Sequence, residues 1–173
     1  MAYVVLVGPP GSGKTTIARR LANSTQRPML DSDHILEEMV GKPAGEYFAE
    51  VGEPAFREKE IEAVAEALNQ ADATGAIVAL GGGAVVTEAN RQALKGQPVI
   101  WLDLEVEEGV RRTIGNNDRP VLQADDPIAR YTELRSTREP FYREVATHRV
   151  RTDKRSPQQA VVDILSYLEE END

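Results

Sequence analysis

The chain has 173 residues, a length typical of one compact domain whose core can form without disulfides or structural metals. Its 20 basic and 29 acidic residues give a net charge of -9, which disfavours nucleic acid and anionic membranes as partners. A small anionic substrate would therefore need a local basic pocket. The chain has no cysteine, so neither a disulfide framework nor a thiolate metal site can form.

Strands and helices are expected to alternate along the chain. Short apolar runs predict strands at residues 3–7, 28–30, 76–80, 98–102 and 148–150. Apolar residues at helical spacing predict helices after residue 14, at 33–40, 53–69, 87–94, 105–113, 127–138 and 140–146, and from 156 onward. Ser32 or Asp33 is expected to cap the second helix, and Gly41 to end it.

This order predicts an α/β fold with a five-stranded parallel sheet and helices on both faces. Ligands of such sheets bind beyond the carboxyl ends of the strands. No apolar run is long enough for a signal-peptide core or a membrane span, so we expect one cytoplasmic domain over residues 1–173. Residues 114–126 are rich in Gly, Asn, Asp and Pro with few apolar anchors, which predicts a mobile loop.

Residues 8–15, Gly-Pro-Pro-Gly-Ser-Gly-Lys-Thr, match the phosphate-loop pattern GxxxxGK[ST]. The match lies directly between an apolar strand and an amphipathic helix, which makes an ordinary glycine turn a poor alternative. In such loops backbone N–H groups surround the phosphates, the lysine (here Lys14) faces the β and γ oxygens, and the following hydroxyl (here Thr15) ligates Mg²⁺. We therefore expect ATP and Mg²⁺ to bind, with Gly11, Ser12, Gly13, Lys14, Thr15 and Thr16 around the nucleotide.

Two carboxylates, Asp31 and Asp33, follow the second predicted strand at the ligand edge of the sheet. One could hold a water of Mg²⁺, and the other could accept the proton of an attacking hydroxyl. The alternative is that they only cap the next helix, and both roles can coexist.

Arginines and glycines are candidates for the second substrate. Arg57 and Arg138 could each grip a carboxylate through two hydrogen bonds, and the Gly81-Gly82-Gly83 backbone can approach a substrate closely. Glu60, three residues after Arg57, could orient it. Taken singly, each arginine fits a solvated helix residue better than a ligand, and Glu60 could equally be surface charge.

Three further residues are candidates on the nucleotide side. Arg119, inside the predicted mobile loop, could neutralise the transferring phosphoryl group when the loop closes. Arg112 could stack on one face of the adenine, and Pro157 could form the second wall. The two histidines, His34 and His148, lack the spacing of a metal site and are expected to be structural or exposed.

In their order and spacing these motifs resemble the shikimate kinase family over nearly the whole chain. The matching segments are GPPGSGKT at 8–15, DSD at 31–33, FR at 56–57, GGGA at 81–84, RR before the loop, RP at 119–120 and REPFYREVA at 138–146. The resemblance implies a P-loop fold of the nucleoside monophosphate kinase type. It also implies transfer of the γ-phosphoryl group of ATP to the 3-hydroxyl of shikimate, in aromatic amino acid biosynthesis.

The resemblance further implies roles for individual residues. Lys14, Asp33 and Arg119 would be catalytic, and Thr15 and Asp31 would serve the Mg²⁺ ion. The shikimate pocket, within residues 31–60 and beyond, would contain Asp33, Phe48, Phe56, Arg57, Gly81, Gly82, Gly83 and Arg138. Arg112, Arg119, Arg155 and Pro157 would complete the nucleotide site, and residues 113–126 would form a lid. A monomer is expected, with ATP and shikimate as its small-molecule partners.

Two rival interpretations use the same phosphate loop. A gluconate kinase or a nucleoside monophosphate kinase would need other acceptor residues, and a nucleotide acceptor would call for a base pocket and more phosphate-binding arginines. A switch protein could bind ATP without transferring a phosphoryl group. The DSD, FR and GGG segments favour an acidic polyol as the acceptor.

Overall fold

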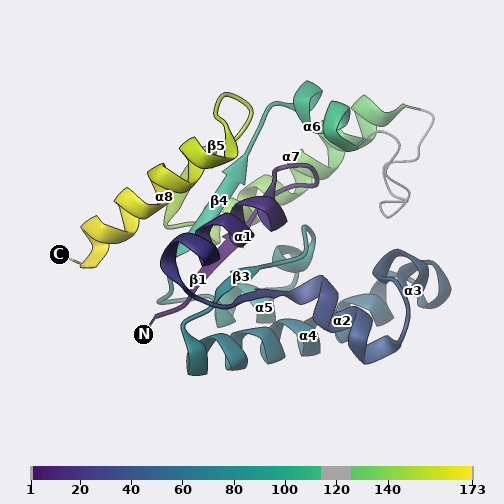
Figure 1. Ribbon diagram of the computed structural model, residues 1–173. Coiled ribbons are helices and arrows are strands. Elements are labelled where there is room, and N and C mark those ends of the chain that lie inside the picture. Colours follow the sequence, from purple (N-terminus) through teal and green to yellow (C-terminus); the bar gives the residue numbers. More distant parts are fainter. Residues whose placement is uncertain (1, 114–125, 173) are drawn as a thin grey trace.

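The computed structural model describes residues 2–113 and 126–172 (Figure 1). Within these residues the strands are β1 (Val4–Val7), β2 (Met29–Asp31), β3 (Ile77–Ala79), β4 (Val99–Asp103) and β5 (His148–Arg151). They form one parallel sheet in the order β2-β3-β1-β4-β5. The prediction of a five-stranded parallel α/β sheet is thereby confirmed.

Helices cover both faces of this sheet (Figure 1). They are α1 (Lys14–Thr25), α2 (Ser32–Val40), α3 (Ala44–Val51), α4 (Glu53–Thr74), α5 (Glu88–Ala93), α6 (Val106–Thr113), α7 (Pro127–Val145) and α8 (Pro157–Asn172), with the 3₁₀ turn η1 (Ala84–Val86). None of the helices in the described part of the chain is both long and apolar enough to cross a membrane.

Alternate residues of each strand pack into two separate cores. Val4 and Leu6 of β1 face α1 and α8, whereas Val5 and Val7 face the layer that contains α2, α4 and α7. Because both faces are buried, every residue of β1 is apolar, as the sequence predicted. The sheet is thus a rigid base, and the loops at the carboxyl ends of β1, β2 and β3 carry the site.

Three details differ from the sequence prediction. Helix α3 was not predicted, since none of its residues is fully buried and its apolar pattern is short. The predicted break at Pro140 is wrong: α7 is continuous from Pro127 to Val145, and Pro140 lies exposed inside it. The cap of α2 is Asp31, not Ser32 or Asp33, because its side chain accepts from the backbone N–H groups at the start of the helix.

Candidate active site

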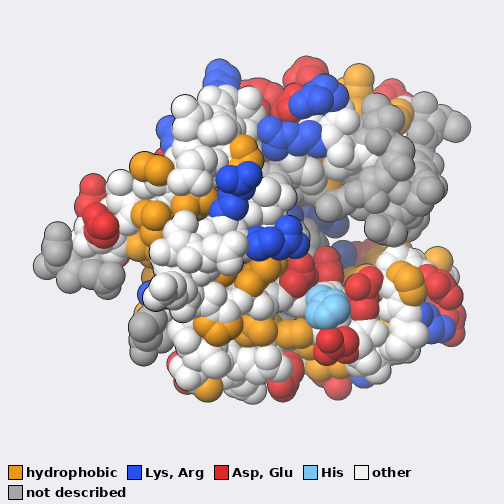
Figure 2. All heavy atoms as spheres, viewed as in Figure 1, with side chains coloured by type: hydrophobic (Ala, Val, Ile, Leu, Met, Phe, Trp, Pro, Cys, Tyr) orange, Lys and Arg blue, Asp and Glu red, His pale blue; other side chains and the backbone are white. Residues whose placement is uncertain are grey.

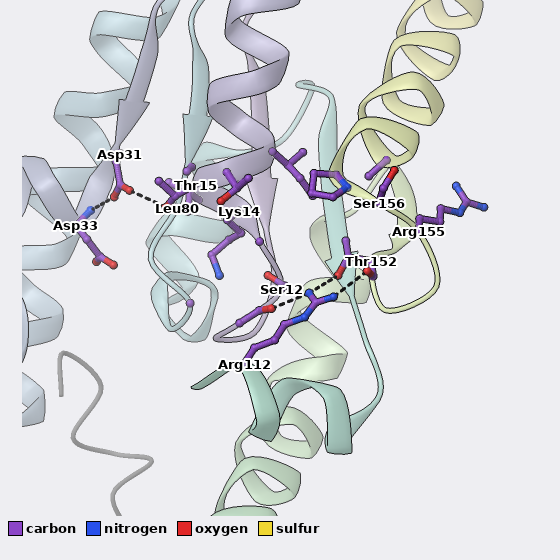
Figure 3. A pocket seen from close by; sticks show the side chains of 18 residues that line it. Ser12, Lys14, Thr15, Asp31, Asp33, Leu80, Arg112, Thr152, Arg155 and Ser156 are labelled. Atoms are coloured by element: carbon purple, nitrogen blue, oxygen red, sulfur yellow. Dashed lines mark hydrogen bonds between the residues drawn. The ribbon is translucent and has the colours of Figure 1, made fainter. Parts of the chain in front are cut away.

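The phosphate loop runs from β1 into α1 and forms a wall of a cavity of about 380 Å³ (Figure 3). Gly11 and Gly13 have φ angles of 79° and 92°, in the left-handed region that glycine enters without a Cβ clash. Lys14 Nζ donates to the carbonyl oxygen of Gly8 at 2.6 Å, so its charge lies inside the loop. The structure places the predicted nucleotide residues of the loop on this cavity: Gly11, Ser12, Gly13, Lys14, Thr15 and Thr16.

Thr15 and Asp31 lie together beside the loop. The hydroxyl of Thr15 donates to Asp31 Oδ2 at 3.5 Å. Asp31 Oδ1 accepts from the backbone N–H of Asp33 at 2.9 Å, and this cap fixes the direction of the carboxylate. A hydroxyl and a carboxylate are oxygen ligands of the kind that Mg²⁺ prefers, and this ion usually takes its remaining ligands from water and substrate phosphates. The donor set therefore fits Mg²⁺.

Arg112 of α6 is fixed at the opposite rim of the cavity. Its guanidinium donates to the carbonyl oxygens of Gly11 and Thr152, each at 3.0 Å, and to Glu108 Oε1 at 2.9 Å. Hydrogen bonds from Arg111 and then from Arg112 lower the pKa of Glu108 to about 2. These bonds hold the guanidinium beside the loop, where a flat cationic group can meet a base.

The other residues predicted for the nucleotide side have mixed placements. Pro157 and Arg155 both line the cavity. The guanidinium of Arg155 is ion-paired with Asp163, and Figure 3 shows the side chain extending away from the phosphate loop. Arg119 and most of the predicted lid lie outside the described residues.

A second cavity, of about 210 Å³, adjoins the first, and Asp33 and Gly82 line both. Figure 2 shows a hollow on this face, with Lys and Arg side chains gathered on one side of it and Asp and Glu side chains on the other. The second cavity brings together residues that are far apart in the sequence and were predicted for the acceptor: Asp33, Phe48, Phe56, Arg57, Gly82, Gly83 and Arg138. The lining of this cavity holds three arginines, Arg57, Arg130 and Arg138, and three carboxylates, Asp33, Glu53 and Glu60.

Each glycine of the turn after β3 lies against one of the side chains predicted for the acceptor. A Cβ on Gly81 would lie 2.4 Å from Asp33 Oδ1, and one on Gly83 would lie 2.7 Å from both terminal nitrogens of Arg57. A Cβ on Gly82 would lie 3.5 Å from Arg138 Nη1. Side chains at these positions would displace the carboxylate or the first guanidinium, so the turn requires glycine for close approach. Gly81 packs against the carboxylate of Asp33 and does not itself line the second cavity.

Arg57 is oriented by Glu60 across one turn of α4. Arg57 Nη1 donates to Glu60 Oε1 at 2.9 Å, and the residue Glu60 is only 2% exposed. Burial raises the pKa of the Glu60 carboxyl, and the charge of Arg57 opposes this rise. The orientation that the sequence only suggested for this pair is present in the structure.

The sequence did not predict several side chains whose hydrogen bonds hold the loops of the site. Ser32, 1% exposed, accepts a hydrogen bond from the Gly81 backbone at 2.9 Å and so joins the DSD segment to the glycine turn. Tyr131 and Tyr142 of α7 donate to the carbonyl oxygens of Pro10 and Gly82, each at 2.7 Å. Only the fold brings these distant partners together. Glu108, by contrast, had a local signal, because it lies four residues before Arg112 on a helix.

Comparison with known proteins agrees with this geometry. The family model described as shikimate kinase matches residues 10–169. The chain is 55% identical to the shikimate kinase of Corynebacterium efficiens, with 97% of each chain covered, and 55% identical to that of Corynebacterium diphtheriae, with 96% and 94% covered. The solved structure of the shikimate kinase from Acinetobacter baumannii in complex with shikimate is 34% identical, has a TM-score of 0.92, and is matched over 99% of this chain and 94% of that one. The chain belongs to the shikimate kinase family.

Proposed function

We propose that this chain transfers the γ-phosphoryl group of ATP to the 3-hydroxyl of shikimate, giving shikimate 3-phosphate and ADP. One observation carries the proposal: Asp33 lies where the cavity of the phosphate loop meets the cavity lined by Arg57 and Arg138. A donor phosphate and an acceptor hydroxyl can meet at this carboxylate. The shikimate bound to the Acinetobacter baumannii relative supports the choice of acceptor.

On the donor side, the phosphate loop and the N-terminus of α1 bind the triphosphate through backbone N–H groups and Lys14. Arg112 and Pro157 lie at the rim where the base would rest. Thr15 and Asp31 would hold Mg²⁺, which supplies charge neutralisation at the phosphates. Arg119 is proposed as a further cation at the transferring group.

On the acceptor side, Arg57 and Arg138 would grip the carboxylate of shikimate, because guanidinium groups match carboxylates in bidentate geometry. Phe48 and Phe56 form the apolar wall beside them, with ring centroids 5.1 Å apart. The backbone of Gly82 and Gly83 closes the pocket. Asp33 then meets the reacting hydroxyl, while the two arginines fix the far end of the acid.

Catalysis in this arrangement is mostly positioning and charge neutralisation, because phosphoryl transfer passes through a loose transition state. Asp33 aims the hydroxyl and accepts its proton late, so it need not be a strong base. We propose that residues 1–173 act as one domain in the cytoplasm, as the length and the apolar pattern of the sequence predict. We propose a monomer because the family resemblance implies one.

The proposal is tested by assaying Asp33→Asn and Lys14→Ala for ADP formation with Mg²⁺, ATP and shikimate. Loss of the Asp33 carboxylate is expected to lower kcat by about 10²- to 10⁴-fold, the range for a positioned acid or base. Asp72→Asn, an exposed carboxylate on α4, is the matched control and should keep wild-type turnover. Wild-type turnover in Asp33→Asn would refute the role of Asp33.

The acceptor is tested with the wild-type protein by replacing shikimate with gluconate or with nucleoside monophosphates. ADP should form in proportion to added shikimate and not to the other acceptors. ADP formation that depends on gluconate or on a nucleoside monophosphate would show that the chain phosphorylates an acceptor other than shikimate. ATP binding without acceptor-dependent ADP would indicate a switch protein.

A further inference from the structure

The two arginines of the acid pocket are held by different partners. Arg57 is ion-paired with Glu60 at 2.9 Å and with Glu53 at 3.5 Å. Arg138, on α7, has no carboxylate oxygen within ion-pairing distance among the residues that the structure describes. No ion pair with a described carboxylate therefore holds this side chain.

A buried phenol lies beside Arg138. Tyr142 is four residues later on α7, on the same face of the helix, and is 1% exposed. Its hydroxyl donates to the carbonyl oxygen of Gly82 at 2.7 Å. Burial raises the pKa of the phenol, and the nearby positive charge of Arg138 opposes this rise. Arg138 Nη1 also lies 3.5 Å from the point that a Cβ on Gly82 would occupy. The phenol and the guanidinium thus lie against the same glycine of the turn.

We propose that Tyr142 is a positioning residue, which holds Arg138 and the Gly82 backbone in their acid-binding arrangement before shikimate enters. The proposal rests on the role of Arg138 proposed above. A long arginine side chain loses rotamer freedom when it binds an anion, and a partner that restrains it beforehand reduces that loss.

A phenol suits this task better than a carboxylate. A carboxylate would neutralise part of the guanidinium charge, whereas a neutral hydroxyl leaves that charge available to the substrate. Burial raises the pKa of Tyr142 to about 12, so the phenol keeps its proton at neutral pH. The ring is itself fixed, because it stacks on Trp101 with centroids 5.9 Å apart and an interplanar angle of 29°.

The test is a double-mutant cycle of Tyr142→Phe and Arg138→Ala, with KM for shikimate, KM for ATP and kcat measured for each variant. Phenylalanine keeps the ring on Trp101 and removes only the hydroxyl. We expect Tyr142→Phe to raise KM for shikimate about 10-fold, because the carbonyl oxygen of Gly82 loses its buried hydrogen bond. KM for ATP and kcat should stay within about twofold. In the Arg138→Ala background, Tyr142→Phe should raise KM by a smaller factor than in the wild-type background, because only the Gly82 backbone is left to position.

Tyr131→Phe is the matched control, because it removes another buried phenol hydroxyl from α7, one that donates to Pro10. Its effect on shikimate affinity should add to that of Arg138→Ala. An unchanged KM for shikimate in Tyr142→Phe, or full additivity with Arg138→Ala, would overturn the positioning role while leaving the proposed function intact. If Arg138→Ala alone leaves the affinity unchanged, the carboxylate grip fails, and this proposal fails with it.

The wild-type protein allows a second measurement that does not depend on the folding of a variant. The Nε–H signal of Arg138 in ¹⁵N-labelled protein is assigned by its absence in Arg138→Lys, and its relaxation is measured without ligands. A restrained guanidinium predicts an order parameter above about 0.6, the upper limit for flexible groups. A lower value would mean that Arg138 is ordered only by the substrate, which contradicts the proposal.

Discussion

Glu60 lies in the acid pocket with its carboxyl almost completely excluded from water. Burial raises its pKa above the ordinary value of 4.5, against the opposing charge of Arg57. The folded protein therefore binds this proton more tightly than the unfolded chain does. The contribution of Glu60 to stability is complete below pH 4.5 and is lost as the pH rises through the folded-state pKa.

The direction of this pH dependence leads to a prediction for Glu60→Gln, whose side chain at position 60 cannot titrate. The free energy of unfolding of the wild type, minus that of Glu60→Gln, should fall as the pH is raised from about 4 to about 7. Urea denaturation at a series of pH values measures it. Glu53→Gln removes an exposed carboxylate from the same arginine and controls for the loss of a partner charge. A difference that is constant or rises with pH would contradict the raised pKa.

At the residue scale, the sequence predicted the side chains that line the acceptor cavity better than the side chains that hold the glycine turn in place. Asp33, Arg57 and Arg138 were candidates by residue type and became site residues through the order and spacing of the motifs, and the structure places all three on one cavity. The hydroxyls of Ser32 and Tyr142 were missed. Neither had a local signal, because each bonds to a glycine that is far away in the sequence.

The helix α2 depends on a residue that also faces the proposed metal site. Asp31 Oδ1 accepts the cap hydrogen bond from Asp33 N at 2.9 Å, while Oδ2 accepts from Thr15 Oγ1 at 3.5 Å. One carboxylate thus serves the element with one oxygen and the chemistry with the other. The two functions can be separated by substitution, because a cap needs an acceptor and a metal ion needs a charge.

We expect Asp31→Ala to destabilise the protein by about 1 kcal/mol, the usual cost of losing a cap, and to raise the Mg²⁺ concentration needed for activity. Asp31→Asn keeps the side-chain oxygen, so it should cost only a few tenths of a kcal/mol and yet share the higher Mg²⁺ requirement. Urea unfolding and Mg²⁺ titration of the initial rate measure the two effects. Equal instability of both variants would argue against the cap, and an unchanged Mg²⁺ dependence would argue against the metal role.

Elements were predictable where local signals were strong. The strand, loop and helix of residues 3–25 followed from an apolar run, glycines and helical spacing. Helix α3 lacked such a signal, since it packs on the core only through partly buried residues such as Tyr47 and Phe48. Pro140 was misleading, because a helix interior tolerates a proline when tertiary contacts on both sides hold it; in α7 these include Tyr131 and Tyr142.

At the scale of the whole molecule, the two cavities are built from segments that only the complete fold brings together. The phosphate loop follows β1, Asp33 follows β2, the glycine turn follows β3, and Arg138 comes from α7. The parallel sheet order, which places β1 between β3 and β4, gathers these ends at one edge. The sequence predicted five parallel strands but not their order, because strand order depends on packing between distant segments.

A site assembled in this way couples ligand binding to global stability, because an unfolded chain has no pocket for the acid. At 100 times its dissociation constant, shikimate should raise the free energy of unfolding by about 2.7 kcal/mol. For a domain of this size that corresponds to an increase in Tm of about 5–11 °C, measurable by thermal denaturation. Arg138→Ala, at the same shikimate concentration, should lose most of this increase while keeping the increase produced by ADP. Arg143→Ala removes an exposed arginine from the same helix and should keep both. A shikimate-induced increase that survives in Arg138→Ala would mean that the acid binds elsewhere on the protein.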